Sequence, residues 1–267
     1  MIRCYLSYLG VLLAIAPSAS AFVATFPAET FAPGGDLGAQ IAGKDGWNLD
    51  GDPLYNPADS RGLSYSNLMP DSVGAQLGGN YDVPPANGEV YLWHLAPQTL
   101  QDASFSVMFV IQASNELNLG RDEFGFSFRD AANSNIFTIL LVPVSGGTGD
   151  AYQVRYTVGA QTTVDALDVN NDPLFIFENS PYSLGFNFTP NGANPNFTAM
   201  VDTTSFSGTA TGLGAVMIDR LGMEWNLVGD GANNGLLVDN ITLVPEPSAV
   251  LLVTLTALGF ASRRKRG

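Results

Sequence analysis

An oxygen-rich segment near the start of the chain contains side chains that suit calcium. Asp45, Asp50 and Asp52 lie within eight positions of one another, and the amide of Asn48 lies between them. Calcium takes about six to eight oxygen ligands, which carboxylates, amides and carbonyls supply. No glutamate closes the segment at the twelfth position, so the spacing is not that of an EF-hand. Because acidic residues beside glycine also form ordinary turns, the segment is either a calcium site or a plain turn.

The other acids give little support to hydrolytic chemistry. A glycosidase needs two carboxylates that flank the scissile bond. No Glu-x-Asp pair occurs anywhere, and Asp122, Glu123 and Glu224 stand alone beside aromatic segments. We expect these three acids to lie on solvated strand faces.

A serine hydrolase would need a histidine base, and His94 is the single histidine. It alternates with Val90 and Leu92, so it shares their strand face, while Tyr91 and Trp93 point the other way. We expect a structural imidazole held by hydrogen bonds. One histidine and one cysteine are too few ligands for a zinc or copper site. The sequence therefore predicts a protein that is not an enzyme.

The elements around these residues alternate with a period of two, which indicates half-buried β-strands. Apolar side chains occupy every second position in five segments, 105–111, 124–128, 152–158, 182–188 and 221–227. Glycine, proline and asparagine gather between such segments and form turns. About ten to thirteen strands without crossover helices predict an all-β, antiparallel β-sandwich. We find no repeat of the length that a β-propeller requires.

Charge excludes one large class of partner. The full chain of 267 residues has a formal net charge of −14. Between Phe22 and Val244 only six basic residues stand against 24 acidic ones, a net charge of −18. A surface this acidic repels nucleic acid, so we expect no DNA or RNA partner.

The first 21 residues have the features of a secretory signal peptide. Arg3 precedes the apolar stretch 6–16, and the small residues Ala19, Ser20 and Ala21 follow it. We expect signal peptidase to cleave after Ala21. The alternative, a permanent N-terminal anchor, is less suited to an apolar stretch this short, which ends at Pro17.

The C-terminus contains three parts in a fixed order, and we assign them to a separate segment, 245–267. A proline-rich break, Val244-Pro245-Glu246-Pro247, precedes the apolar stretch 248–260. A basic cluster, Arg263-Arg264-Lys265-Arg266, then ends the chain. Thirteen residues of helix span about 20 Å, short of a hydrocarbon core of about 30 Å. The alternative to a sorting segment is a simple tail anchor.

This order resembles the PEP-CTERM sorting signal of Gram-negative bacteria. The resemblance implies that a membrane protease of the exosortase type recognises the segment. It further implies export to the cell surface or beyond, with only transient membrane anchoring, often in species that make exopolysaccharide or biofilm.

The middle of the chain, 22–244, resembles the concanavalin A-like jelly rolls that often precede such tails. The residues that carry the likeness are Leu77 to Pro84, Phe124 to Asp130, Leu184 to Pro190 and Asp239 to Leu243. The resemblance implies that the first and last strands lie side by side, so we pair 22–31 with 236–244.

From these features we expect an exported, non-catalytic cell-surface or matrix protein whose lectin-like sandwich contacts extracellular glycan. Trp47 and Trp93 are candidates for stacking on sugar rings, although a sandwich core also takes tryptophan. Two alternatives stay open: a polysaccharide-processing enzyme on the same fold, and a purely structural matrix component without a defined ligand.

Overall fold

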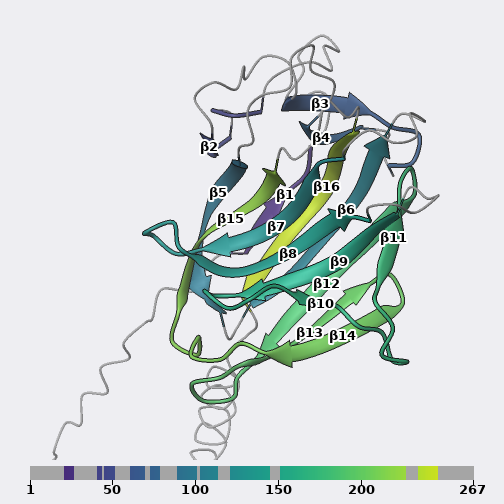
Figure 1. Ribbon diagram of the computed structural model, residues 1–267. Helices are drawn as coiled ribbons and strands as arrows, with labels where there is room; N and C mark the ends of the chain where they lie inside the picture. The colour runs from purple at the N-terminus through teal and green to yellow at the C-terminus, as the bar shows by residue number, and fades with distance from the viewer. Residues whose placement is uncertain are drawn as a thin grey trace, which may run out of the picture.

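Two antiparallel sheets packed face to face make up the domain in the computed structural model (Figure 1). The structure describes residues 21–26, 41–43, 45–51, 61–69, 73–78, 89–100, 103–113, 121–144, 151–226 and 234–245. Within these ranges it has sixteen strands, more than the ten to thirteen expected. Three of them, β1, β10 and β11, have only two or three residues, which is too short for alternation to be seen in the sequence.

Sheet A contains both ends of the domain. Its strands, in spatial order, are β14 (Thr204–Thr209), β13 (Asn196–Val201), β12 (Pro181–Thr189), β6 (Ala103–Ala113), β16 (Asn234–Pro245), β4 (Val73–Gly78) and β3 (Arg61–Tyr65), and β1 (Phe22–Ala24) pairs with β16. β16 ends at Pro245, which can close a strand because its carbonyl group remains available.

Sheet B lies in front of sheet A in Figure 1. Its strands, in spatial order, are β10 (Val164–Asp165), β9 (Ala151–Val158), β8 (Asn135–Pro143), β7 (Glu123–Arg129), β15 (Met217–Asn226), β5 (Glu89–Thr99) and β2 (Trp47–Gly51), and β11 (Phe175–Phe177) pairs with β9.

The predicted pairing of the first and last strands is confirmed over a shorter span. β1 pairs with residues 241–243 of β16, whereas residues 235–238 pair with β4 on the same side. A bulge between Asp239 and Thr242, where Asn240 has a φ of 53°, separates the two pairings. Residues 27–31 lie outside the described ranges.

The core lies between the sheets and is rich in phenylalanine, as the alternation predicted. The inward positions of all five predicted segments are buried or half-buried wherever they are described; Leu227 is not among the described residues. Phe105 and Phe186 of sheet A lie 6.0 Å and 5.1 Å, between ring centroids, from Phe126 and Phe137 of sheet B. The rings of the two sheets pack against one another across the interface, and the residues between them on each strand point to the outer face of the sheet.

Candidate functional site

The oxygen-rich segment near the start of the chain is only partly described. Asp45 lies exposed in the turn before β2, and Asp50 lies in β2 itself, while Asp52 is outside the described ranges. Asp50 Oδ2 accepts a hydrogen bond from Trp93 Nε1 at 2.9 Å, so its carboxylate already has a partner. Among the described residues no group of three or more His, Cys, Asp or Glu side chains is placed to hold a metal. The calcium site stays a prediction.

His94 has the structural role that its strand position predicted. Its Nδ1 lies 2.7 Å from the carbonyl oxygen of Leu95, and its Nε2 lies 2.9 Å from that of Asp45. Its ring also packs against Phe22 and Trp47, with centroids 4.6 Å and 5.7 Å away. Both ring nitrogens lie within hydrogen-bond distance of a backbone carbonyl oxygen, and the tautomer decides which of them donates.

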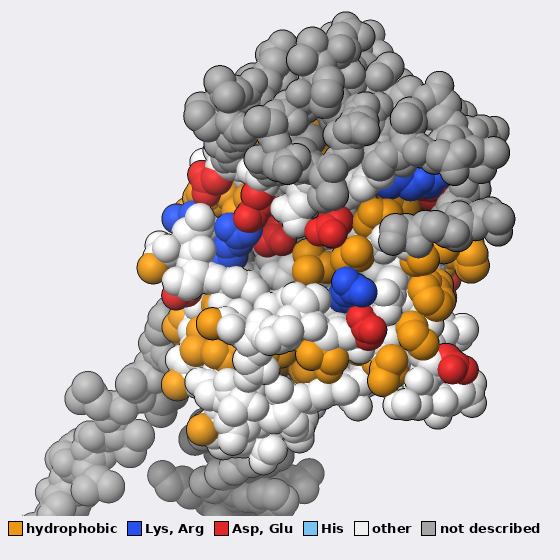
Figure 2. All heavy atoms as spheres, viewed as in Figure 1, with side chains coloured by type: hydrophobic (Ala, Val, Ile, Leu, Met, Phe, Trp, Pro, Cys, Tyr) orange, Lys and Arg blue, Asp and Glu red, His pale blue; other side chains and the backbone are white. Residues whose placement is uncertain are grey.

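A cluster of charged side chains lies on the outward positions of sheet B, and we call this surface the arginine face. It consists of Arg129, Arg155 and Arg220 with their neighbours Asp50, Glu89, Tyr91, Trp93, Asp165, Asp219 and Glu224. Figure 2, in the view of Figure 1, shows acidic and basic side chains gathered on this side of the molecule.

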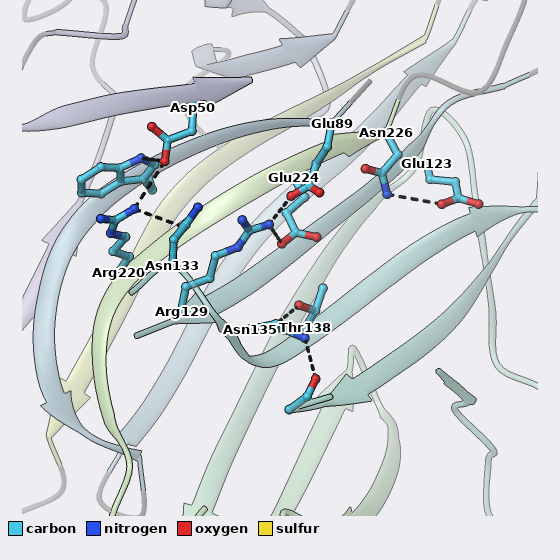
Figure 3. A network of polar contacts seen from close by, with 12 residues as sticks. Asp50, Glu89, Glu123, Arg129, Asn133, Asn135, Thr138, Arg220, Glu224 and Asn226 are labelled. Carbon is cyan, nitrogen blue, oxygen red and sulfur yellow. Dashed lines mark hydrogen bonds and ion pairs between the residues drawn. The ribbon is translucent and has the colours of Figure 1, made fainter. Parts of the chain in front are cut away.

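Arg129 joins three strands at the centre of the arginine face. Its guanidinium carbon lies 4.0 Å from the centroid of the Tyr91 ring, in a cation–π contact. Its Nη2 donates to Glu224 Oε1 at 2.7 Å and also to Glu89, as Figure 3 shows. The Nε of Arg129 is buried and makes no hydrogen bond within the described part of the chain.

Arg220 forms a second, parallel arrangement next to the first. Its backbone lies opposite Arg129 in the β15–β7 pairing, and its guanidinium carbon lies 4.2 Å from the centroid of the Trp93 ring. Its Nη1 donates to Asn133 at 3.1 Å and lies 3.4 Å from Asp50 Oδ2 (Figure 3). Asn133 reaches it from the β7–β8 turn with a φ of 66°. Each arginine thus covers one aromatic ring and contacts at least one carboxylate.

Burial and charge shift two ionisation equilibria at this centre. Burial raises the pKa of the Tyr91 hydroxyl well above its usual value. Burial acts to lower the pKa of Arg129, but the charges of Glu224 and Glu89 and the hydrogen bonds to them raise it further, so the guanidinium is permanently cationic.

The expectation that Asp122, Glu123 and Glu224 lie on solvated strand faces is wrong for two of the three. Glu224 is buried beneath Arg129, and Asp122 is buried and accepts a hydrogen bond from Trp225 Nε1 at 2.9 Å. Only Glu123 is partly exposed, where it contacts Asn226. Both buried acids have a partner from a strand about a hundred residues away, which alternation within one strand cannot reveal.

The aromatic side chains of the arginine face were only partly foreseen. Trp47 is buried in the core, whereas Trp93 is half-buried and points outward, as its alternation with His94 indicated. Phe175 and Phe177 lie on the same outer face at the β11 edge, where Phe175 pairs with Gln153 of β9. Their exposed fractions are 42% and 54%, so both rings are open to a ligand. Neither ring could be assigned to this face from the sequence, because β11 has only three residues.

The outer face of sheet A has a different character, and we call it the hydroxyl face. A groove of ≈ 610 Å³ crosses β16, β6, β12 and β13 there. Hydroxyl, amide and methionine side chains line most of it, namely Ser104, Ser106, Met108, Ser183, Asn187, Thr198, Met200, Asn240 and Thr242. Asp202 is the one acid in this lining, and it accepts hydrogen bonds from the backbone and hydroxyl of Ser183.

The end of the chain agrees with a known sorting signal. Residues 243–266 match the family model described as the PEP-CTERM protein-sorting motif. The chain carries a PEP-CTERM sorting motif. The match covers the predicted residues Val244, Pro245, Glu246 and Pro247 and the basic cluster up to Arg266. The motif implies an exported protein that is sorted to the cell surface. Residues 246–267 lie outside the described ranges, as do residues 1–20 of the predicted signal peptide.

The fold ahead of the PEP-CTERM motif is that of the legume lectins. The lectin UEA-II, solved in complex with galactose, aligns with a TM-score of 0.51 at 12% identity, covering 86% of this chain and 100% of the lectin. This likeness shows the predicted all-β sandwich of two antiparallel sheets and, at this identity, the fold alone.

Two further solved structures align less well. The carbohydrate recognition domain of Emp47p has a TM-score of 0.49 at 12% identity, over 76% of this chain and 90% of that domain. The Ca²⁺/Man2-bound exoplasmic/lumenal domain of VIP36 has a TM-score of 0.48 at 12% identity, over 84% and 87%. A comparison with curated proteins found no match. In the part of the chain that the structure describes, no helix is long and apolar enough to cross a membrane.

Proposed function

We propose that this chain is an exported, non-catalytic cell-surface or matrix protein that contacts extracellular polysaccharide through its arginine face. The observation that carries the proposal is the combination of outward aromatic rings and polar side chains on one sheet face. Trp93, half-buried with Arg220 over its ring, lies toward one edge, and the exposed Phe175 and Phe177 lie at the other. Aromatic rings stack on the apolar faces of sugars, while charged and amide groups between them bond sugar hydroxyls.

The span between the two aromatic groups suits a chain rather than a single sugar. β5 and β11 are separated by five inter-strand steps through β15, β7, β8 and β9. At about 4.8 Å for each step the distance is about 24 Å. Outward side chains along this path include Gln153, Arg155 and Asn226, which donate or accept hydrogen bonds.

Two features support a non-catalytic role. Among the described residues, Glu89 and Glu224 most resemble the carboxylate pair of a glycosidase, because both contact the Nη2 of Arg129. Glycoside hydrolysis requires one carboxyl group that is protonated and free to reach the leaving oxygen. Here one guanidinium holds both carboxylates, and Glu224 is buried. The likeness to a galactose-complexed lectin supports the same role.

A sedimentation assay with insoluble polysaccharides and a glycan array would test the proposal on the purified full-length chain. We expect Phe175→Ala and Phe177→Ala to lose binding, while Met200→Ala on the hydroxyl face, where Met200 is also exposed, retains it. Melting temperatures identify any variant that fails to fold. If Met200→Ala lost as much binding as the variants of the arginine face, binding would not be specific to sheet B. Turnover of the bound polysaccharide would establish the enzyme alternative. An array without any hit would favour a purely structural component.

A further inference from the structure

Around Arg129 and Arg220 the arginine face is layered, with a carboxylate more exposed than the guanidinium that it contacts. Arg129 covers the Tyr91 ring and has a side chain only 12% exposed, whereas Glu89, which it binds, is 51% exposed. Arg220 covers the Trp93 ring and is 19% exposed, whereas Asp50 is 45% exposed. The same order, aromatic ring, guanidinium, carboxylate, therefore occurs twice. A ligand that approaches this face meets the carboxylates of Glu89 and Asp50 before it meets either arginine.

The local charge balance is also negative. Arg129 is bound by Glu89 and Glu224, and Arg220 lies 3.4 Å from Asp50 and 3.9 Å from Asp219. Four carboxylates thus surround two guanidinium groups, within a stretch of chain whose net charge is −18. A surface of one sign raises the local concentration of oppositely charged ligands and repels those of the same sign.

From this layering we infer that the polysaccharide bound at the arginine face carries free amino groups. The inference rests on the proposed function and names the ligand class for that same site. Ammonium groups along an amino-sugar polymer donate charge-assisted hydrogen bonds to the exposed carboxylates of Glu89 and Asp50. Uronic-acid polymers, in contrast, would place carboxylate against carboxylate.

Three oligosaccharides of equal length test the inference by calorimetry on the full-length chain. These are a glucosamine oligomer, its fully N-acetylated form, which has the same ring but no charge, and an oligomer of uronic acid. We expect the amino oligomer to bind at least tenfold more tightly than the acetylated one and the uronate to bind most weakly. Raising the salt concentration should reduce the difference, because charges exposed to solvent are screened.

Two variants that remove a carboxylate charge test whether Glu89 and Asp50 bind the amino groups. Glu89→Gln and Asp50→Asn should each lower affinity for the amino oligomer several-fold, and by a larger factor than affinity for the acetylated oligomer. Asp202→Asn removes the same charge from the hydroxyl face and should change neither, which separates a local contact from general attraction to an acidic protein.

Each other outcome overturns a defined part of the argument. Preference for the uronate, equal affinity for the amino and acetylated oligomers, or an equal loss in Asp202→Asn would overturn the amino-sugar inference and leave glycan binding intact. Absence of binding to all three oligomers and to every polysaccharide of the sedimentation assay, with a folded protein, would remove the proposed function as well.

Discussion

The two outer faces of the sandwich share one core and differ in almost every other respect. On the arginine face, side chains from neighbouring strands hold one another: Arg129 alone joins Tyr91 and Glu89 of β5 to Glu224 of β15. On the hydroxyl face, the groove is lined by short neutral side chains, and its acid, Asp202, bonds the nearby Ser183. The inward residues of both sheets pack into the same core, whereas the outward residues of the two sheets differ in charge and size.

This difference shows where each face gets its rigidity. On the hydroxyl face, the hydrogen bonds between strands and the core beneath them hold the surface in place. Substitution of a single outward side chain there should therefore change the free energy of unfolding little. In the arginine face a charge network adds to these hydrogen bonds, and removing one member of the network leaves buried partners without compensation. Substitutions on the two outer faces should therefore have unequal effects on the free energy of unfolding. Substitutions in the core should have similar effects whichever sheet they come from.

The core provides the largest expected effect. Phe126→Ala in sheet B and Phe186→Ala in sheet A should each lower the free energy of unfolding by about 3–5 kcal/mol, because each leaves a cavity among packed rings. Urea unfolding followed by tryptophan fluorescence measures both. Phe177→Ala, whose ring is exposed, should change stability by less than about 0.5 kcal/mol. A large asymmetry between Phe126→Ala and Phe186→Ala would show that the sheets do not share one core.

The arginine network provides the next effect. Arg129→Met should cost about 2–4 kcal/mol in unfolding free energy, because it leaves the buried Glu224 carboxylate without its cation. Adding Glu224→Gln to Arg129→Met should restore more than half of this loss, since the buried charge is then also removed. Asp202→Asn on the hydroxyl face should cost less than about 1 kcal/mol. If the double variant were no more stable than Arg129→Met, the ion pair would not be the source of the effect.

Much of this fold could be predicted from the sequence, and the arginine network could not. Alternation assigned the inward residues of β6, β7, β9, β12 and β15, because a buried face imposes a period of two wherever a strand is long enough. Arg129 meets Glu89 and Glu224 from 40 and 95 positions away, and only the register between strands brings them together. One signal was available: Arg129, one of only six basic residues in the domain, directly follows the aromatic segment 124–128, where a carboxylate partner is expected.

A pair of glycines sharpens the comparison between the faces. A Cβ on Gly222 would lie 2.4 Å from the Tyr91 ring and 2.6 Å from the carbonyl oxygen of Leu92. Gly222→Ala should therefore destabilise the protein by about 1–3 kcal/mol, because the backbone must move. A Cβ on Gly185, the counterpart on the hydroxyl face, would meet only the carbonyl oxygen of Phe105, at 3.6 Å. Gly185→Ala should be neutral or stabilising by up to about 1 kcal/mol. Thermal unfolding that ranked the two variants in the opposite order would contradict the close packing of Tyr91 over β15.

The smallest effect concerns pH, and it should arise from the arginine face. Burial raises the pKa of Tyr91 in the folded protein above the value of about 10 that an unfolded chain has. The unfolded state therefore loses this proton first, so the stabilisation is complete below pH 10 and declines as the pH rises further. One such group changes the unfolding free energy by about 1.4 kcal/mol for each pH unit in that window. Tyr91→Phe removes this contribution, so its stability should fall less steeply than that of the wild type between about pH 10 and 11.5. Urea titrations at matched pH values measure the two slopes, and parallel slopes would mean that the Tyr91 hydroxyl is accessible to solvent in the folded state.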